Sequence, residues 1–549
     1  MNKEIIQIGE LLKSKGLVTD AHIGLALKEQ KITGEKVGEI LERLGFVSQF
    51  DVANALSEQY GIPYADVDRL APHREALALF NMKLCITNDF LPLQRTERSI
   101  KIVTSNPQVE QLARLLVRQV ALQPEFYIGE RSKIQNAIQH YYYFLENPVE
   151  SLFQREIDLV GRDADMARSL DQLISHLLHL AVRHRASDIH ISPTEATVNL
   201  AFRVDGVMRH MYSMAPSLRR LVSTLKLKAN MDIAEQRLPQ DGSFSAEILN
   251  RKYDMRVSTT TGPYGENMVI RLLPMESNFM TLSQLGFYDE DVATLKKIFN
   301  QPYGIVLLTG PTGAGKTTTL FSAVRVLDML EKHIVTVENP IEYRIPLVRQ
   351  TEINPRAGYN FANAVRHLLR HDPDVILVGE VRDQETAETA VQASETGHLV
   401  LSTLHTNTAF GAIPRLRALG IEPFMLSESL VGVVGQRLVR RICAECKESY
   451  QPSEEERRYL GTADIEVLYR GRGCDACGHT GYLGRTAIYE ILHITPDLAR
   501  QIGRGADFHD LVEMATNAGF KNMLHSGVRK VAQGETTVSE LIRVLGTSV

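Results

Sequence analysis

Gly310-Pro311-Thr312-Gly313-Ala314-Gly315-Lys316-Thr317-Thr318 is the stretch on which the organisation of this chain depends. It follows a short apolar run at 305–308 and opens a segment whose leucines and valine recur at helical spacing. A strand, a glycine-rich loop and a helix in this order form the context that a P-loop requires. The stretch therefore predicts a nucleotide site. A glycine-rich turn that matches the pattern by accident is the competing interpretation.

The predicted chemistry of this loop follows from its residue types. Several negative oxygens must be packed closely, so the loop must turn its backbone N–H groups inward, and glycines permit that turn. The N-terminus of the following helix adds the positive end of its dipole. We expect Lys316 to reach the β- and γ-phosphates of ATP and the Thr317 hydroxyl to bind Mg²⁺.

Bulk composition narrows the class of protein. The chain has 549 residues, 44% of them apolar and 23% charged, which predicts a globular protein of about three to five domains. A formal charge of -5 gives no general attraction to nucleic acid or to an anionic membrane. No apolar stretch approaches the ~18 residues of a membrane span, so we expect a cytoplasmic protein.

Changes in pattern along the chain predict its domains. Residues 1–60 contain an internal repeat, because Gly9-Glu10, Gly16-Leu17-Val18 and Glu29-Gln30 correspond to Gly38-Glu39, Gly45-Phe46-Val47 and Glu58-Gln59, 29 positions later. The pattern predicts that each copy forms a helix, a turn at a glycine and a second helix. The expected segments are a helical repeat over 1–60, an α/β module over 61–145, a linker over 146–165, a module with an antiparallel sheet over 166–285, the P-loop domain with a parallel sheet over 286–440, a tetracysteine insertion over 441–490 and a helical segment over 491–549.

Polar side chains follow three apolar strands downstream of the P-loop. Glu338 and Glu342 end the first, Glu380 ends the second, and His398 and His405 flank the third. Because the carboxyl ends of parallel strands meet in one crevice, these groups strengthen one another as parts of a single site. A carboxylate there can position water or Mg²⁺.

Four of the five cysteines form the pattern C-x2-C-x27-C-x2-C, at Cys443, Cys446, Cys474 and Cys477. Two close pairs of thiolates suit a closed tetrahedral zinc site, which is structural because no ligand position is left for water. The alternatives are two chance turns or a redox pair. Cys85 is unpaired and is expected in the core.

Further segments match, in chain order, the signatures of one known family: Ala186-Ser187-Asp188-Ile189-His190, Arg203-Val204-Asp205-Gly206, Leu238-Pro239-Gln240-Asp241-Gly242, residues 377–383, residues 396–407 and Gln436-Arg437-Leu438. On these motifs, the P-loop and the four cysteines, the chain resembles the type II secretion and type IV pilus assembly ATPases, the GspE/PulE/PilB family. The resemblance extends over nearly the whole chain.

The resemblance implies an α/β multidomain fold. Its parts would be a RecA-like P-loop domain, a preceding PAS-like domain, a helical and α+β N-terminal region and a zinc-binding insertion. It also implies site residues. Glu342 is the expected catalytic base, Glu380 the Walker B glutamate after Gly379, and His405 a member of the histidine box. Arg256 and Arg271 are expected to reach nucleotide phosphate from the adjacent module.

The same resemblance implies a function. We expect a hexameric cytoplasmic motor that hydrolyses ATP to drive the assembly of pilin-like subunits, docked at the inner membrane through a platform protein. A non-catalytic nucleotide-gated regulator is one alternative, which the presence of Lys316, Thr317, Glu342 and Glu380 disfavours. A nucleic-acid translocase is another, disfavoured by the acidic balance and the lack of a basic stripe interleaved with aromatics.

The N-terminal repeat is similar to a domain that binds cyclic di-GMP in some family members, where an arginine opens the first motif. Here that position is Gln7, and its counterpart in the second copy is Lys36. Glutamine is neutral and lacks the planar cation that stacks on a base. We therefore expect weak or absent binding of cyclic di-GMP, with the domain mainly docking a membrane partner.

Overall fold

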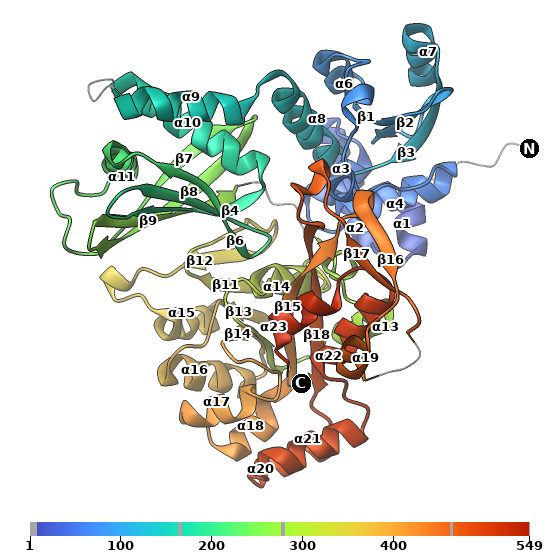
Figure 1. Ribbon diagram of the computed structural model, residues 1–549. Helices are drawn as coiled ribbons and strands as arrows, with labels where there is room; N and C mark the ends of the chain where they lie inside the picture. The colour runs from blue at the N-terminus through green and yellow to red at the C-terminus, as the bar shows by residue number, and fades with distance from the viewer. Residues whose placement is uncertain (1–7, 163–166, 276–279, 462–464, 548–549) are drawn as a thin grey trace, which may run out of the picture. The chain divides into compact units, whose positions relative to one another are not determined.

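The computed structural model describes residues 8–162, 167–275, 280–461 and 465–547 (Figure 1). The chain forms two compact units. The larger unit combines Met1–Ala55 with Asn278–Val549, and the smaller unit is Leu56–Ser277. Most of the helical repeat at the N-terminus, up to Ala55, thus belongs to the same unit as the P-loop.

A seven-stranded sheet organises the larger unit, in the order β12-β11-β13-β14-β10-β15-β18. Neighbouring strands are parallel except for β18, which pairs antiparallel with β15. Every residue of β10, β13 and β14 is buried, as expected for parallel strands that are covered on both faces. The strands are β10 (Gly304–Thr309), β11 (Ile334–Glu338), β12 (Arg349–Glu352), β13 (Val375–Val378), β14 (Leu399–Leu404), β15 (Leu430–Ile442) and β18 (Tyr482–His493).

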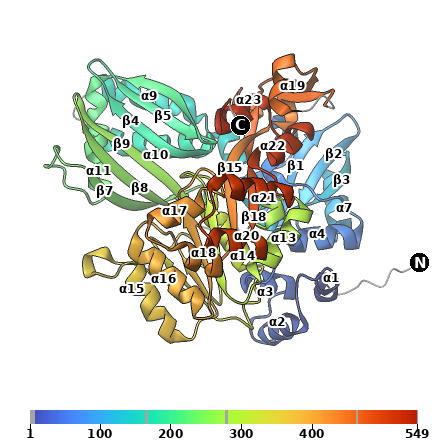
Figure 2. The ribbon, with the colours of Figure 1, turned by 90° about the horizontal axis from the view of Figure 1, so that it is seen from below.

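Helices cover both faces of this sheet and build a separate core on each face. One core holds α15 (Phe361–Leu368), α16 (Gln384–Glu395), α17 (Ala412–Ala418), α18 (Pro423–Ser429), α20 (Pro496–Gly503) and α21 (Phe508–Asn517). The other holds α12 (Leu282–Leu285), α13 (Asp289–Phe299), α14 (Lys316–Val324) and the N-terminal helices. Figure 2 shows α15 to α18 as one group of helices and α1 to α3 as another.

The N-terminal repeat forms the helices expected from its sequence. These are α1 (Ile8–Ser14), α2 (Asp20–Thr33), α3 (Val37–Arg43) and α4 (Gln49–Tyr60). The repeat packs on the segment that follows α14, since Arg325 Nε donates to the Gly45 carbonyl at 3.0 Å. His22 stacks on Phe46 at 4.1 Å and lies 3.2 Å from Asp328 Oδ1.

A small subdomain carries the four cysteines and the C-terminal helices of the larger unit. Its elements are β16 (Lys447–Tyr450), β17 (Leu468–Gly471), α19 (Glu454–Leu460), α22 (Met523–Ala532) and α23 (Val538–Leu545). Glu540 on α23 is fully buried and binds Arg440 of β15 through Oε2 at 2.8 Å. This ion pair ties the C-terminal helix to the central sheet.

The smaller unit contains two sheets. The first is the three-stranded β1-β2-β3, packed with α5 (Arg74–Leu77), α6 (Met82–Thr87), α7 (Glu110–Val120) and α8 (Arg131–Glu146). Its strands are β1 (Phe90–Arg95), β2 (Ser99–Thr104) and β3 (Gln123–Ile128). Cys85 is fully buried in this core, as expected.

The second sheet is antiparallel, in the order β6-β5-β4-β9-β8-β7. Helices α9 (Val149–Arg162), α10 (Ala167–Arg183) and α11 (Arg220–Lys228) pack against it, and Figure 1 shows α9 and α10 along one face. The strands are β4 (Ala186–Pro193), β5 (Val198–Val204), β6 (Val207–Met214), β7 (Gln240–Ile248), β8 (Arg251–Gly262) and β9 (Gly265–Pro274).

Helix α9 differs from the linker expected over 146–165. Val149, Phe153, Ile157 and Val160 are all buried in the core of the second sheet. Their spacing of three and four residues puts them on one face of a helix. Charged residues between them hide this stripe in the sequence, and residues 163–166 of the expected linker lie outside the described residues.

Candidate nucleotide site and cysteine cluster

The P-loop joins the carboxyl end of β10 to the N-terminus of α14. Gly310 has φ +145, and a Cβ there would lie 2.3 Å from the carbonyl oxygen of Gln436. Gly315 caps α14 in the left-handed conformation, with φ +84. Both positions therefore require glycine, and together they turn the loop so that it curls over the helix N-terminus.

Lys316 lies within the loop that its own segment forms. Its Nζ donates to the carbonyl oxygens of Gly310 at 2.7 Å and Pro311 at 3.0 Å. Burial lowers the pKa of Lys316, while the charge of Glu380 acts in the opposite direction. Thr317 is half-buried in the first turn of α14, whereas Pro311, Thr312 and Gly313 are exposed. The ammonium thus lies against the backbone of the loop, between its carbonyls and the N-terminus of α14.

Gln436 of β15 fixes the base of the loop, a role that the sequence does not predict. It is fully buried; its Nε2 donates to the Ala314 carbonyl at 2.9 Å, and its Oε1 accepts a hydrogen bond from Thr319 Oγ1 at 2.8 Å. The side chain thereby joins the loop to the first turns of α14 through two buried bonds. The one signal in the sequence is its place in the segment Gln436-Arg437-Leu438.

Glu380 follows β13 and meets two other polar groups. Its Oε2 lies 2.5 Å from Arg382 Nε and 3.6 Å from His405 Nε2, and its side chain is 13% exposed. Burial lowers the pKa of His405, Lys316 adds to this effect, and Glu380 opposes it. Glu380 and His405 are therefore neighbours, and the charge of Lys316 is close enough to influence the pKa of His405.

Gly379 precedes Glu380 directly after β13. A Cβ at this position would lie 3.2 Å from the Val337 carbonyl and 3.3 Å from the Phe361 ring. The Gly379 N–H also donates to that carbonyl at 2.8 Å. The close approach of β11 thus leaves little room for a side chain at residue 379.

The carboxylates after β11 are farther from the P-loop. Glu338 is buried and accepts from Thr336 at 2.6 Å and from Gln350 at 2.9 Å, whereas Glu342 is exposed. Burial raises the pKa of Glu338, its two hydrogen bonds oppose the shift, and the charge of Glu342 adds to it. Strands β13 and β14 separate β11 from β10, which corresponds to about 14 Å.

His398 and His405 lie at opposite ends of β14. His398 Nδ1 is 2.9 Å from the Ala393 carbonyl, at the amino end of the strand. A strand of this length spans about 20 Å. Of the two histidines, only His405 is therefore at the edge of the sheet that carries the P-loop.

Arg256 and Arg271 belong to the smaller unit, where they are direct partners on neighbouring strands β8 and β9. Each has a carboxylate near its Nε: Asp254 lies 3.5 Å from Arg256, and Asp188 lies 3.0 Å from Arg271. Their expected contact with a nucleotide stays a prediction.

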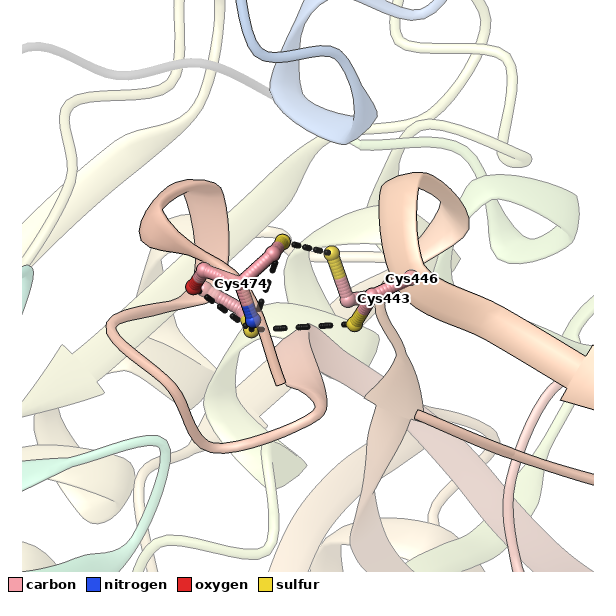
Figure 3. A group of neighbouring side chains, drawn as sticks. Cys443, Cys446 and Cys474 are labelled. Atoms are coloured by element: carbon pink, nitrogen blue, oxygen red, sulfur yellow. Dashed lines mark hydrogen bonds between the residues drawn. The ribbon is translucent and has the colours of Figure 1, made fainter. Parts of the chain in front are cut away.

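The four cysteines gather in two facing loops (Figure 3). Sulfur atoms lie 3.8 Å apart for Cys443 and Cys474, 3.9 Å for Cys446 and Cys477, and 3.8 Å for Cys474 and Cys477. A tetrahedral ion with metal–sulfur bonds of about 2.3 Å places its sulfurs about 3.8 Å apart. The backbone N–H groups of Gly473 and Gly481 also donate to sulfur at 3.2 Å. The cluster thus has the geometry of a metal site.

Comparison with known proteins identifies the family. The model of the type II/IV secretion system protein family matches residues 163–543, and the model of the MshEN domain matches residues 60–147. The chain belongs to the type II/IV secretion system protein family. The MshEN match falls on the module with β1 to β3. Gln7, the position expected to weaken cyclic di-GMP binding, lies outside the described residues.

Several relatives match most of the chain. The type II secretion system protein E of Xanthomonas campestris pv. campestris is 35% identical, and the type IV pilus assembly ATPase PilB of Myxococcus xanthus is 34% identical, each over 98% of both chains. The type II secretion system ATPase E of Vibrio cholerae is 45% identical over 72% of this chain and 78% of that protein. These matches confirm the resemblance seen in the sequence and make this chain an ATPase of the family.

A solved structure supports the fold. The Legionella pneumophila ATPase DotB aligns with 68% of this chain and 95% of its own, with a TM-score of 0.50 and 21% sequence identity. The predicted fold class, a multidomain α/β protein built around a RecA-like P-loop domain, is confirmed. Within the described residues, no helix combines the length and apolar character needed to cross a membrane.

Proposed function

We propose that this chain is the motor of a type II secretion or type IV pilus assembly machine, which hydrolyses ATP to drive the assembly of pilin or pseudopilin subunits. One observation carries the proposal: Glu380 Oε2 and His405 Nε2 lie 3.6 Å apart at the carboxyl ends of β13 and β14, in a P-loop chain whose relatives over 98% of both chains are named for these machines. A charged, partly buried cluster at the end of a parallel sheet is suited to phosphoryl transfer.

The substrate ATP places its phosphates in the loop formed by residues 310–318. Lys316 exchanges its two loop carbonyls for β- and γ-phosphate oxygens, and its charge offsets theirs. Glu380 orients the attacking water. Glu342 is the carboxylate proposed as the catalytic base. His405 contacts the γ-phosphate, and Arg256 and Arg271 are two further residues proposed to bind phosphate.

Two metal ions are part of the proposal. Thr317 in the first turn of α14 is the residue that would hold Mg²⁺, which supplies charge neutralisation between the β- and γ-phosphates when bound. Cys443, Cys446, Cys474 and Cys477 would hold Zn²⁺, because their sulfur separations fit a tetrahedral ion with four thiolate ligands. That zinc stabilises the two loops and takes no part in hydrolysis.

The working form is proposed to be a homo-hexamer. It would be cytoplasmic and held at the inner membrane by a platform or docking protein, with no nucleic-acid partner. Binding of cyclic di-GMP is expected to be weak, because the position expected to carry an arginine is Gln7.

Steady-state ATP hydrolysis by the full chain and two matched variants tests this function. Glu380→Gln removes the carboxylate beside His405, and we expect the rate to fall by orders of magnitude. Glu395→Gln changes an exposed glutamate at the end of α16 and should leave the rate unchanged. A parental rate for Glu380→Gln, or a monomeric mass in the presence of nucleotide and Mg²⁺, contradicts the proposal.

A further inference from the structure

A row of charged side chains crosses the six-stranded sheet of the smaller unit. Arg203 on β5 is the direct partner of Asp188 on β4, Asp188 is the partner of Arg271 on β9, and Arg271 is the partner of Arg256 on β8. Direct partners on neighbouring strands point to the same face of a sheet. One carboxylate therefore lies in a row with three guanidinium groups.

Asp188 is the buried member of this row, with 5% of its surface exposed. Its Oδ1 accepts a hydrogen bond from Arg271 Nε at 3.0 Å. Its Oδ2 accepts one from the Ser187 hydroxyl at 2.8 Å and lies 3.7 Å from Arg203 Nε. Both carboxylate oxygens are thus held, and the group cannot turn away from Arg271 without losing a bond.

The contact with Arg271 leaves the outer edge of the guanidinium available. Only Nε is bound, the side chain is 54% exposed, and neither terminal nitrogen has an acceptor among the described residues. A guanidinium bound in this way keeps the fork that matches phosphate oxygens. Arg256 is held less firmly, because its partner Asp254 is 3.5 Å away and 35% exposed.

We propose that Asp188 is a positioning residue for ATP hydrolysis, which holds Arg271 so that its two terminal nitrogens face a phosphate group. The inference rests on the proposed role of Arg271 at the nucleotide. A long side chain fixed before binding loses less conformational freedom when it meets its ligand. Asp188 itself touches neither substrate nor metal, and it acts only through the arginine.

Four proteins test the inference in a double-mutant cycle: the parent, Asp188→Asn, Arg271→Ala and the double variant. Asparagine keeps the shape and an acceptor oxygen but removes the charge. We expect Asp188→Asn to lower kcat/KM for ATP roughly threefold to tenfold. The double variant should match Arg271→Ala, because a positioning residue has no effect once the arginine is absent. Glu247→Gln, at an exposed position on β7, is the matched control and should keep parental values.

The outcomes separate the inference from the proposed function. Parental kinetics for Arg271→Ala refute the role of this arginine and the inference with it. A normal Asp188→Asn beside an impaired Arg271→Ala refutes the inference alone, and so does a double variant that is slower than Arg271→Ala. If Asp188→Asn fails to fold, Ser187→Ala replaces it. It removes one hydrogen bond from the same carboxylate, so kcat/KM should fall about twofold in the parent and not at all in Arg271→Ala.

Discussion

Gln436→Leu should weaken nucleotide binding although Gln436 is not itself one of the residues proposed to contact the nucleotide. Leucine fills a similar volume but makes neither of the two buried hydrogen bonds of Gln436, to the Ala314 carbonyl and from the Thr319 hydroxyl. The P-loop then loses the side-chain hydrogen bond that joins its Ala314 carbonyl to β15. We therefore expect the loop to sample conformations that do not bind phosphate.

The expected rise in the Kd for nucleotide depends on which hydrogen-bond partners of Gln436 stay unpaired in Gln436→Leu. The Thr319 hydroxyl can turn to the carbonyl four residues earlier in its own helix, so its loss is small. The Ala314 carbonyl stays buried without a partner, which costs about 1–3 kcal/mol. If this cost is about 2 kcal/mol and acts only on the loop conformation that binds phosphate, the Kd for nucleotide rises about 30-fold.

Calorimetric titration of the full chain with a non-hydrolysable ATP analogue measures this Kd. Gln392→Leu is the control, because Gln392 is exposed on α16 of the same unit and should bind as the parent does. Thermal unfolding of both variants separates loss of the loop from loss of the fold. A parental Kd for Gln436→Leu refutes the idea that this side chain holds the loop.

Two further predictions concern stability. Removing the metal with a chelator, or changing Cys474 to serine, should unfold the two cysteine loops, and metal analysis of the parent should find about one zinc per chain; an intact fold after complete metal removal would speak against a structural zinc. Burial alone would raise the pKa of Glu540, but hydrogen bonds from Arg543 and Arg440 outweigh it and leave the pKa below its usual value. Ionised Glu540 therefore stabilises the fold above about pH 4.5. This contribution is lost as the pH falls through the pKa that Glu540 has in the folded protein, which is lower than its pKa in the unfolded chain. Glu540→Gln should cost about 3 kcal/mol at pH 7 and progressively less below pH 4.5 in denaturant unfolding, and a difference independent of pH would contradict this.

Local motifs explain why much of the site could be predicted from the sequence. The P-loop and the four cysteines are short patterns in which spacing alone restricts the chemistry. The sequence predicts Glu380 and His405 in one site because each ends an apolar strand of a parallel sheet, and in the structure Glu380 Oε2 lies 3.6 Å from His405 Nε2. The structure also shows why residue 379 is a glycine: the backbone of β11 lies too close to leave room for a larger side chain.

Contacts between distant segments could not be predicted in this way. Gln436 lies 117 positions from Thr319, and their pairing depends on β15 being the neighbour of β10 in the sheet. Asp188 and Arg271 are 83 positions apart and meet because β4 pairs with β9 and not only with β5. No pattern of residue types reports such a strand order. The sequence does not indicate helix α9 for a local reason, because charged residues interrupt its apolar stripe.

Steady-state ATP hydrolysis by Lys316→Ala is the most direct test of the central claim that the P-loop is a working catalytic site. Lys297→Ala, which changes an exposed lysine on α13, serves as the control. The account predicts that Lys316→Ala lowers the rate by orders of magnitude while its melting temperature stays close to that of the parent. Hydrolysis near the parental rate by a clean preparation of Lys316→Ala would contradict it.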